Sequence, residues 1–208
     1  MGKRHRSIGQ RNRQPRTYKI KRMKKIMFSD KFCLTQAVLS GTKTMTRRLL
    51  KEGTPLGNWE KTAKCLPYKV GDSVAIAQPY KDIIECMAEY SDIIINVDGS
   101  INREYKAGWT NKMFVKADLM PHHIRITDVK VELLQSISVD DILCEGVWQF
   151  YDNKNLFYVS KNIGYAPDVA FLSAREAFWY LIDNISGKGT WESNPWVVAY
   201  SFELIKSK

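Results

Sequence analysis

The pattern of apolar and polar positions along the chain predicts strands and helices in an irregular order. Residues 26–28 (IMF) form a short apolar run typical of a strand, and residues 123–134 alternate over a length that favours one long strand. Apolar residues recur at helical spacing in residues 30–40 and again in residues 173–185. A last strand is predicted in residues 194–205.

Capping residues give the two longer helices their expected ends. Ser29 or Asp30 can cap the first helix, and Gly41 stands where a helix terminator is expected. Ser173 and Glu176 have the spacing of a capping box at the start of the second. Each helix therefore has a boundary signal as well as an apolar face.

Shorter elements and turns occupy the rest of the chain. Ser138 is expected to cap a short acidic helix that Gly146 ends, and a turn at residues 71–72 precedes another strand. A hairpin turn is expected at residues 98–99. The surrounding stretches 81–118 and 148–170 are predicted as irregular and loop-like, respectively. Several strands and about three helices without regular alternation favour an α+β fold.

Composition narrows the class of protein. The 208 residues are 44% hydrophobic, which suits one domain with a sizeable core. No apolar run approaches the roughly 18 residues of a membrane helix. The four cysteines form no CxxC pair, so a disulfide framework or a zinc site is not expected and a reducing cytoplasm fits best.

The net charge of +10 belongs to the N-terminal segment. Residues 1–25 contain eleven Lys or Arg and no acid, which leaves 21 basic against 22 acidic residues in the remainder. Residues 1–22 are therefore predicted to be a disordered basic tail, able to contact nucleic-acid phosphates, ahead of a single domain at 23–208. The alternatives are a solvated tail without a ligand, or translated sequence upstream of a start at Met23.

The segment 40–50 (SGTKTMTRRLL) concentrates polar chemistry straight after an apolar helix. Lys43 is followed by the hydroxyls of Thr44 and Thr46 and then by Arg47 and Arg48. A solvated loop needs no such concentration, whereas a site for a polar or anionic ligand does. The segment is the first candidate for a functional site.

Five motifs together resemble the ASCH domain. They are LSGTKTMTRR, VGDSVAIAQPY, MPHHIRIT, LLQSISVDDILCEGV and NPWVVAYSFEL. The resemblance spans residues 26–205, with little to match at 81–108 and 149–170, and is strongest to the larger ASCH proteins of bacteria, phages and mobile elements. It implies a PUA-like small mixed β-barrel with flanking helices and insertions, and a cleft that meets RNA, nucleotides or modified bases.

The same resemblance implies a set of reaction groups. Some small bacterial members are N4-acetylcytidine amidohydrolases that use a lysine, a threonine three residues later and a glutamate at the end of an acidic helix. Lys43, Thr46 and Glu145 match these positions and are the predicted catalytic residues. A threonine hydroxyl needs a base to take its proton, and a buried lysine can serve. In a regular strand residues 43 and 46 face opposite ways, so the chain must turn between them.

Further residues are expected to bind the substrate. The predicted substrate-binding residues are Thr44, Arg47, Arg48, Gln78, Tyr80, Trp109 and Arg125. The arginines at 47 and 48 would hold phosphate or the base; salt bridges within the fold are their alternative. Tyr80 and Trp109 would stack on a base or pack in the core. Trp191 and Trp196 are expected to close the barrel.

Three functions remain open at this point. The chain is predicted to bind RNA, a nucleotide or a modified nucleoside, with hydrolysis of an N4-acylated cytidine as the sharper hypothesis. The alternatives are a non-catalytic RNA-binding module and, with less support, a ribonuclease. No cofactor or metal is expected, because His122 and His123 are adjacent and cannot face one metal ion from an extended strand.

Overall fold

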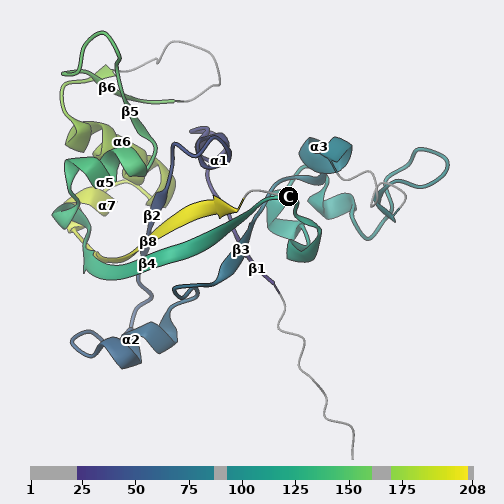
Figure 1. Ribbon diagram of the computed structural model, residues 1–208, viewed down its shortest axis with the longest axis horizontal. Helices are drawn as coiled ribbons and strands as arrows, with labels where there is room; N and C mark the ends of the chain where they lie inside the picture. Colours follow the sequence, from purple (N-terminus) through teal and green to yellow (C-terminus); the bar gives the residue numbers. More distant parts are fainter. Residues whose placement is uncertain (1–22, 87–92, 161–169, 206–208) are drawn as a thin grey trace, which may run out of the picture.

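A five-stranded sheet forms the centre of the protein (Figure 1). The computed structural model describes residues 23–86, 93–160 and 170–205. The strand order is β1 (Lys24–Ile26), β3 (Ser73–Ile76), β4 (His123–Leu133), β8 (Trp196–Ile205) and β2 (Met45–Leu49). β1 and β3 are parallel, and the other neighbours are antiparallel. The predicted long strand and final strand are thus confirmed as β4 and β8, and the mixed α+β class is confirmed with them.

The sheet is open, which corrects the expected barrel. β1 and β2 are its two edges, and no pairing within the described part of the chain joins them. Trp191 and Trp196 accordingly close no barrel. Trp191 packs edge-on against Phe178, with ring centroids 6.1 Å apart, and Trp196 is 42% exposed where β8 begins.

A second sheet occupies part of the stretch that was predicted to be a loop. Its strands are β5 (Val147–Gln149), β6 (Phe157–Val159) and β7 (Ala170–Phe171), all antiparallel. Phe157 and Val159 are buried against the main core, while Tyr158 between them is half-buried. The alternation is real, but strands of two or three residues are too short for periodicity to reveal them.

The first helix is shorter than predicted. α1 (Leu34–Leu39) begins after Cys33, which has a left-handed φ of 54°, and neither Ser29 nor Asp30 caps it. Asp30, in the turn that precedes the helix, instead accepts a hydrogen bond at 2.6 Å from the hydroxyl of Thr35 in its first turn. Gly41, at φ 78°, follows the helix end as expected.

The other predicted helices start and end where their capping residues indicate. Ser138 accepts a hydrogen bond from Asp141 N ahead of α5 (Val139–Cys144). Ser173 accepts one from Glu176 N ahead of α6 (Ala174–Ser186). The sequence patterns missed three of the described helices. These are α2 (Trp59–Cys65), capped by Asn58, α3 (Tyr80–Ile83) and α7 (Thr190–Ser193).

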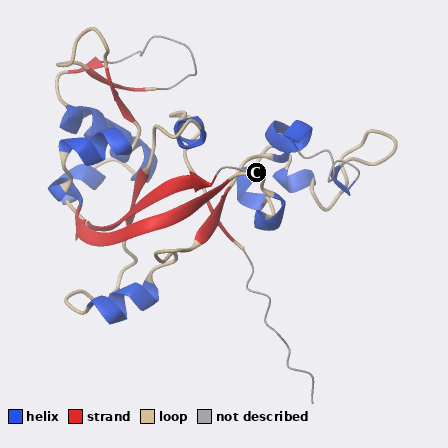
Figure 2. Ribbon diagram, viewed as in Figure 1, coloured by secondary structure: helices blue, strands red, loops and turns tan. Residues whose placement is uncertain are grey.

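Two hydrophobic clusters divide the interior. The larger lies between the central sheet and the helices α1, α5 and α6, and the smaller surrounds Tyr80 in the stretch that includes α3 (Tyr80–Ile83). Figure 2 shows α5, α6 and α7 at one end of the sheet and α3 at the other. The short 3-10 turns are Ile84–Cys86, Lys106–Gly108, Lys112–Phe114, Ala117–Leu119 and Leu134–Ser136. The predicted turn at residues 98–99 is present, with Gly99 at φ 80°.

None of the helices in the described ranges has the length and apolarity that a membrane span requires. Residues 1–22 lie outside those ranges, so the basic tail, and with it the domain boundary at residue 23, stays a prediction.

Tyr200 gives a test of the core that depends on pH. Its side chain on β8 is fully buried, and its hydroxyl has no hydrogen-bond partner among the residues that the structure describes. Burial raises the pKa of Tyr200 to about 12. Between the ordinary tyrosine pKa of about 10 and this value, the native state holds a proton that the unfolded state loses, so the free energy of unfolding falls as pH rises.

We expect Tyr200→Phe to remove the part of the stability loss at alkaline pH that Tyr200 causes. The substitution should change the free energy of unfolding at pH 7 by less than about 1 kcal/mol, because no hydrogen bond is lost. Tyr68→Phe is the matched control. Its hydroxyl donates to Lys25 O at 2.7 Å, and its removal should cost about 0.5–1.5 kcal/mol. Urea denaturation at pH 7 and pH 11 measures both. A Tyr200→Phe variant less stable than Tyr68→Phe would contradict this account.

Candidate functional site

Lys43 enters the protein interior because the chain turns before β2 begins. The backbone N–H groups of Thr42 and Lys43 both donate to Ala37 O at the end of α1, and Thr44 N donates to Cys144 O at the end of α5. Lys43 therefore precedes the strand that starts at Met45, and its side chain is only 2% exposed. This turn meets the condition for residues 43 and 46 to act on one site.

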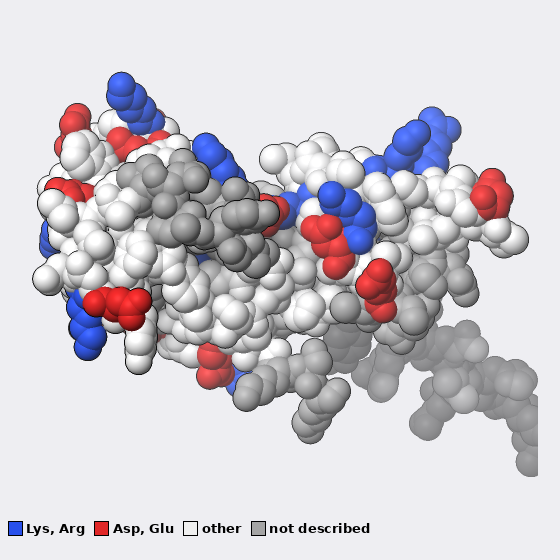
Figure 3. Space-filling view, turned by 90° about the horizontal axis from the view of Figure 1, so that it is seen from above, with Lys and Arg blue, Asp and Glu red and all other residues white. Residues whose placement is uncertain are grey.

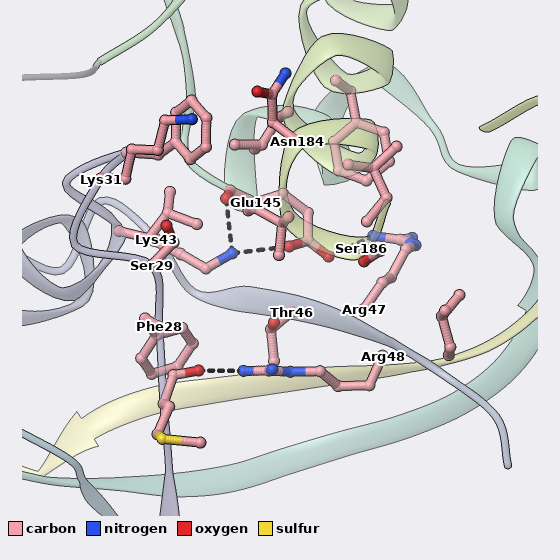
Figure 4. A pocket seen from close by; sticks show the side chains of 18 residues that line it. Phe28, Ser29, Lys31, Lys43, Thr46, Arg47, Arg48, Glu145, Asn184 and Ser186 are labelled. Carbon is pink, nitrogen blue, oxygen red and sulfur yellow. Dashed lines mark hydrogen bonds and ion pairs between the residues drawn. The ribbon is translucent and has the colours of Figure 1, made fainter. Parts of the chain in front are cut away.

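The Lys43 ammonium donates all of its hydrogens. Nζ lies 2.7 Å from Met45 O, 2.6 Å from Glu145 O and 2.7 Å from Glu145 Oε2. An ammonium has three hydrogens, so this bonding is complete. Burial lowers the pKa of Lys43, and the Glu145 carboxylate opposes that shift. Figure 4 shows the two side chains meeting at the pocket wall.

Gly146 ends α5 directly after Glu145, in a backbone conformation that favours glycine. Its φ of 97° lies in the left-handed region, and a Cβ added there would stand 2.8 Å from Leu34 Cδ2 and 3.6 Å from Lys43 Cδ. Another residue would therefore be strained by its backbone and would press on the Leu34 side chain, while its contact with Lys43 would be an ordinary one.

Arg47 is surrounded by carboxylates on the other side of Glu145. Nε and Nη2 contact Glu132 Oε1 at 2.9 and 2.7 Å, Nη2 contacts Asp141 Oδ2 at 2.5 Å, and Nη1 contacts Glu145 Oε1 at 3.2 Å. The remaining Nη1 hydrogen is directed at Met45 Sδ, 3.2 Å away. All five donors are used and the guanidinium is fully buried. Arg47 thus takes the salt-bridge role and has no donor left for a ligand.

A pocket of about 350 Å³ opens beside these ion pairs. Its walls come from residues 27–32, from β2, from Glu145 and from the last turns of α6. Thr46 lines it, and the Thr46 hydroxyl makes no hydrogen bond to any residue that the structure describes. A ligand in the pocket would meet that hydroxyl, the Lys43–Glu145 pair and the rim.

Two cations at the rim have no carboxylate partner among the described residues. Arg48 donates to Met27 O and lies 5.9 Å from the Phe28 ring, and Lys31 lies 5.2 Å from the Phe32 ring. Both side chains line the pocket, as do Ser29 and Asn184. The motif patterns pointed to Arg48 but missed Lys31, Ser29 and Asn184, because nothing local marks the two distant segments as neighbours.

Three of the predicted substrate-binding residues lie in the other half of the fold. Tyr80 is 1% exposed, its hydroxyl accepts a hydrogen bond from Lys116 N at 2.7 Å, and it packs in the smaller cluster together with Trp109. The expectation that the Tyr80 ring stacks on a base is corrected to the core-packing alternative, while Trp109 is only half-buried and its stacking stays a prediction. Gln78 is buried, contacts His122 Nδ1 at 2.9 Å and lines a separate pocket.

Two more predicted residues do not line the pocket. Thr44 joins α5 and β8 through its backbone, since its carbonyl accepts from Phe202 N at 2.8 Å. Arg125 is exposed on β4, and its Nε lies 3.9 Å from Glu203 Oε1. Within the described ranges, no group of three His, Cys, Asp or Glu side chains is placed to hold a metal ion.

Charges of both signs are interspersed on the face seen in Figure 3, which carries no continuous basic patch. The largest set of bases in the sequence stands in the undescribed residues 1–22.

The comparisons with known proteins find similarity to solved structures. No family model matches this chain, and no curated protein does. A protein of family DUF984 from Enterococcus faecalis aligns at 16% identity and a TM-score of 0.34, over 83% of this chain and 66% of the other. An ASCH domain from Lactobacillus crispatus aligns at 14% identity and a TM-score of 0.32, over 82% and 69%.

An ASCH domain is therefore among the solved structures that this chain is similar to, and ASCH is the family that its motifs resemble. The chain spans about two thirds of the length of both aligned proteins. Their names state no ligand and no reaction.

The two neighbouring arginines provide a test of the ion-pair cluster. Arg47→Ala leaves Glu132, Asp141 and Glu145 without their shared cation, and we expect it to lower the free energy of unfolding by about 3–5 kcal/mol. Arg48→Ala is the matched control, because Arg48 is half-buried and pairs with no carboxylate; its loss should cost less than about 1.5 kcal/mol. Urea denaturation of the two variants measures the difference. Equal losses would show that Arg47 does not hold the cluster together.

Proposed function

We propose that the pocket binds an acylated cytidine-type nucleoside or nucleotide and hydrolyses its N4-acyl amide. The observation that carries this proposal is the position of Thr46. Its unbonded hydroxyl lines the same pocket as a buried lysine whose pKa is lowered by burial. Nucleophilic attack on an amide uses a hydroxyl and a base within hydrogen-bond reach of each other, and the proposal requires Thr46 and Lys43 to come within that reach when the substrate binds.

The size and charge of the pocket support a ligand of this class. Its volume of about 350 Å³ falls at the lower end of the range for small-molecule sites, which begins near ~300 Å³. Ser29 and Asn184 offer hydrogen-bonding groups for the edge of a base. Lys31 and Arg48, which pair with no carboxylate in the described part of the chain, favour a ligand that carries phosphate over a neutral nucleoside.

The first half of the reaction forms a covalent intermediate. Thr46 Oγ1 attacks the carbonyl carbon of the amide while its proton passes to the neutral amine of Lys43. A neutral Lys43 donates to only two of its present three acceptors, so a lone pair is left for the incoming proton. The tetrahedral adduct then collapses, the C–N bond breaks, and the new Lys43 ammonium protonates the departing amine.

The second half of the reaction restores the enzyme. Water attacks the ester on Thr46, Lys43 takes a proton from that water, and Thr46 leaves with a proton to regain its hydroxyl. One water is consumed, and one carboxylic acid and one cytosine amine are released. Glu145 stabilises the Lys43 ammonium each time it forms, and Arg47 positions Glu145 without touching the substrate.

One observation favours a second function, binding of RNA or a nucleotide without catalysis. The Lys43 ammonium has complete hydrogen bonding, which stabilises the charged form that cannot act as a base. The ribonuclease alternative has no comparable support, because no metal cluster occurs in the described part of the chain and the described histidines lie outside the pocket.

Two substitutions test the catalytic proposal. Thr46→Val keeps the shape and removes the hydroxyl, and Lys43→Met removes the amine and keeps most of the stem. Each should reduce turnover of N4-acetylcytidine by at least ~100-fold, the lower end of what positioned acid–base groups contribute. Chromatography of released cytidine measures the rates.

Thr44→Val is the matched control, since Thr44 has the same side chain and does not line the pocket. We expect it to retain wild-type turnover within about twofold. Full activity in Thr46→Val would exclude Thr46 as the nucleophile. An inactive wild type on every acylated nucleoside and nucleotide tested would replace the hydrolase with the binding function.

A further inference from the structure

One wall of the pocket is apolar and contains none of the residues that act in the proposed reaction. α6 presents Phe178, Leu181, Ile182 and Ile185 to it, at the i, i+3, i+4 and i+7 spacing of one helix face. The first three are buried in the core, whereas Ile185 is 42% exposed. The apolar face of the helix thus continues beyond the core and into the open pocket.

Two more exposed apolar side chains complete this wall. Met27 is 37% exposed and Leu49 is 44% exposed, and both line the same pocket as Ile185. Single exposed apolar residues are ordinary on protein surfaces. Three of them line one pocket together with the Thr46 hydroxyl, so one ligand in the pocket can contact them.

We propose that this apolar wall receives the acyl group of the substrate, and that the preferred acyl group is longer than acetyl. The inference rests on the proposed hydrolysis. An N4-acylated cytidine has a polar end, which suits the hydroxyl, amide and cations of the rim, and an acyl end, which can form only apolar contacts. An acetyl group presents a single methyl, which is too small to cover the side chains of Ile185, Met27 and Leu49 together.

The position of the reacting carbon links the two ends. The carbonyl carbon must lie at Thr46 Oγ1. Thr46 lines the pocket from β2, the strand that also carries Leu49 of the apolar wall. The acyl chain is attached to that carbon on the side opposite the amine, so it extends away from the groups that bind the base. Burial of apolar chain against apolar wall then adds binding free energy with each methylene.

A series of substrates tests the inference. The kcat/KM values of N4-acetyl-, N4-butanoyl- and N4-hexanoylcytidine should rise with chain length, by up to about fourfold per methylene, the ratio that corresponds to burial of one CH₂. Ile185→Ser should flatten this rise. Equal or falling values along the series in the wild type would overturn the inference.

Trp179→Ser is the matched control. Trp179 lies on the same helix at 41% exposure, close to that of Ile185, but does not line the pocket. The rise with chain length should be the same in this variant as in the wild type. If Trp179→Ser flattened it as much as Ile185→Ser, the effect would come from the helix as a whole and the proposed wall would be excluded.

A binding measurement separates this inference from the proposed reaction. Acetate, butanoate and hexanoate, the acids that the series would release, are titrated into the wild type and followed by NMR. Tighter binding of the longer acids, with shifts at the methyl groups of Ile185 and Leu49, supports the wall even if no substrate turns over. If the amides turn over but neither kcat/KM nor acid binding depends on chain length, the proposed hydrolysis stands and the proposed acyl-binding wall is excluded.

Discussion

The Lys43 ammonium lies inside the protein, and the surrounding elements are arranged so that this charge can be buried. Desolvation of an isolated ammonium is costly, and only close acceptors make it tolerable. The chain supplies three acceptors within 2.7 Å, two of them from Glu145 at the end of α5. The position of α5 against the start of β2 is therefore tied to one side chain.

The second cation extends this constraint across the fold. Arg47 joins Glu132 of β4, Asp141 of α5 and the far oxygen of Glu145, so that one guanidinium holds a strand and a helix to β2. Lys130 adds a contact to Asp141 at 2.8 Å. The result is a wall of ion pairs beside the Thr46 hydroxyl, which makes no hydrogen bond to the described residues. The proposed reaction depends on such charged groups being held in place.

The sequence predicted the elements that depend on local chemistry. The caps of α5 and α6 are side-chain contacts over three residues, and the strand at 123–133 is long enough for its alternation to be read. The grouping of Lys43, Thr46 and Glu145 came from motif resemblance, and the structure places these three residues at one pocket.

What the sequence could not supply depends on long-range pairing. The three carboxylates around Arg47 stand 85, 94 and 98 residues away along the chain. No local pattern indicates that Arg47 pairs with them rather than with solvent or a phosphate. Tyr80 was assigned to the cleft for its residue type, but burial in the smaller cluster decided its role. The strands β5 and β6 were missed because three residues give too little alternation to distinguish a strand from a loop.

The central claim is that burial prepares Lys43 to lose a proton while Glu145 holds the charged form in place. An NMR titration of the Lys43 side chain, in the wild type and in Glu145→Gln, tests this claim most directly. The wild-type pKa should lie below the ordinary lysine value of 10.5, and it should fall further in the variant, because a carboxylate that stabilises the ammonium has been removed. A wild-type pKa at or above 10.5, or one that Glu145→Gln leaves unchanged, would contradict the account.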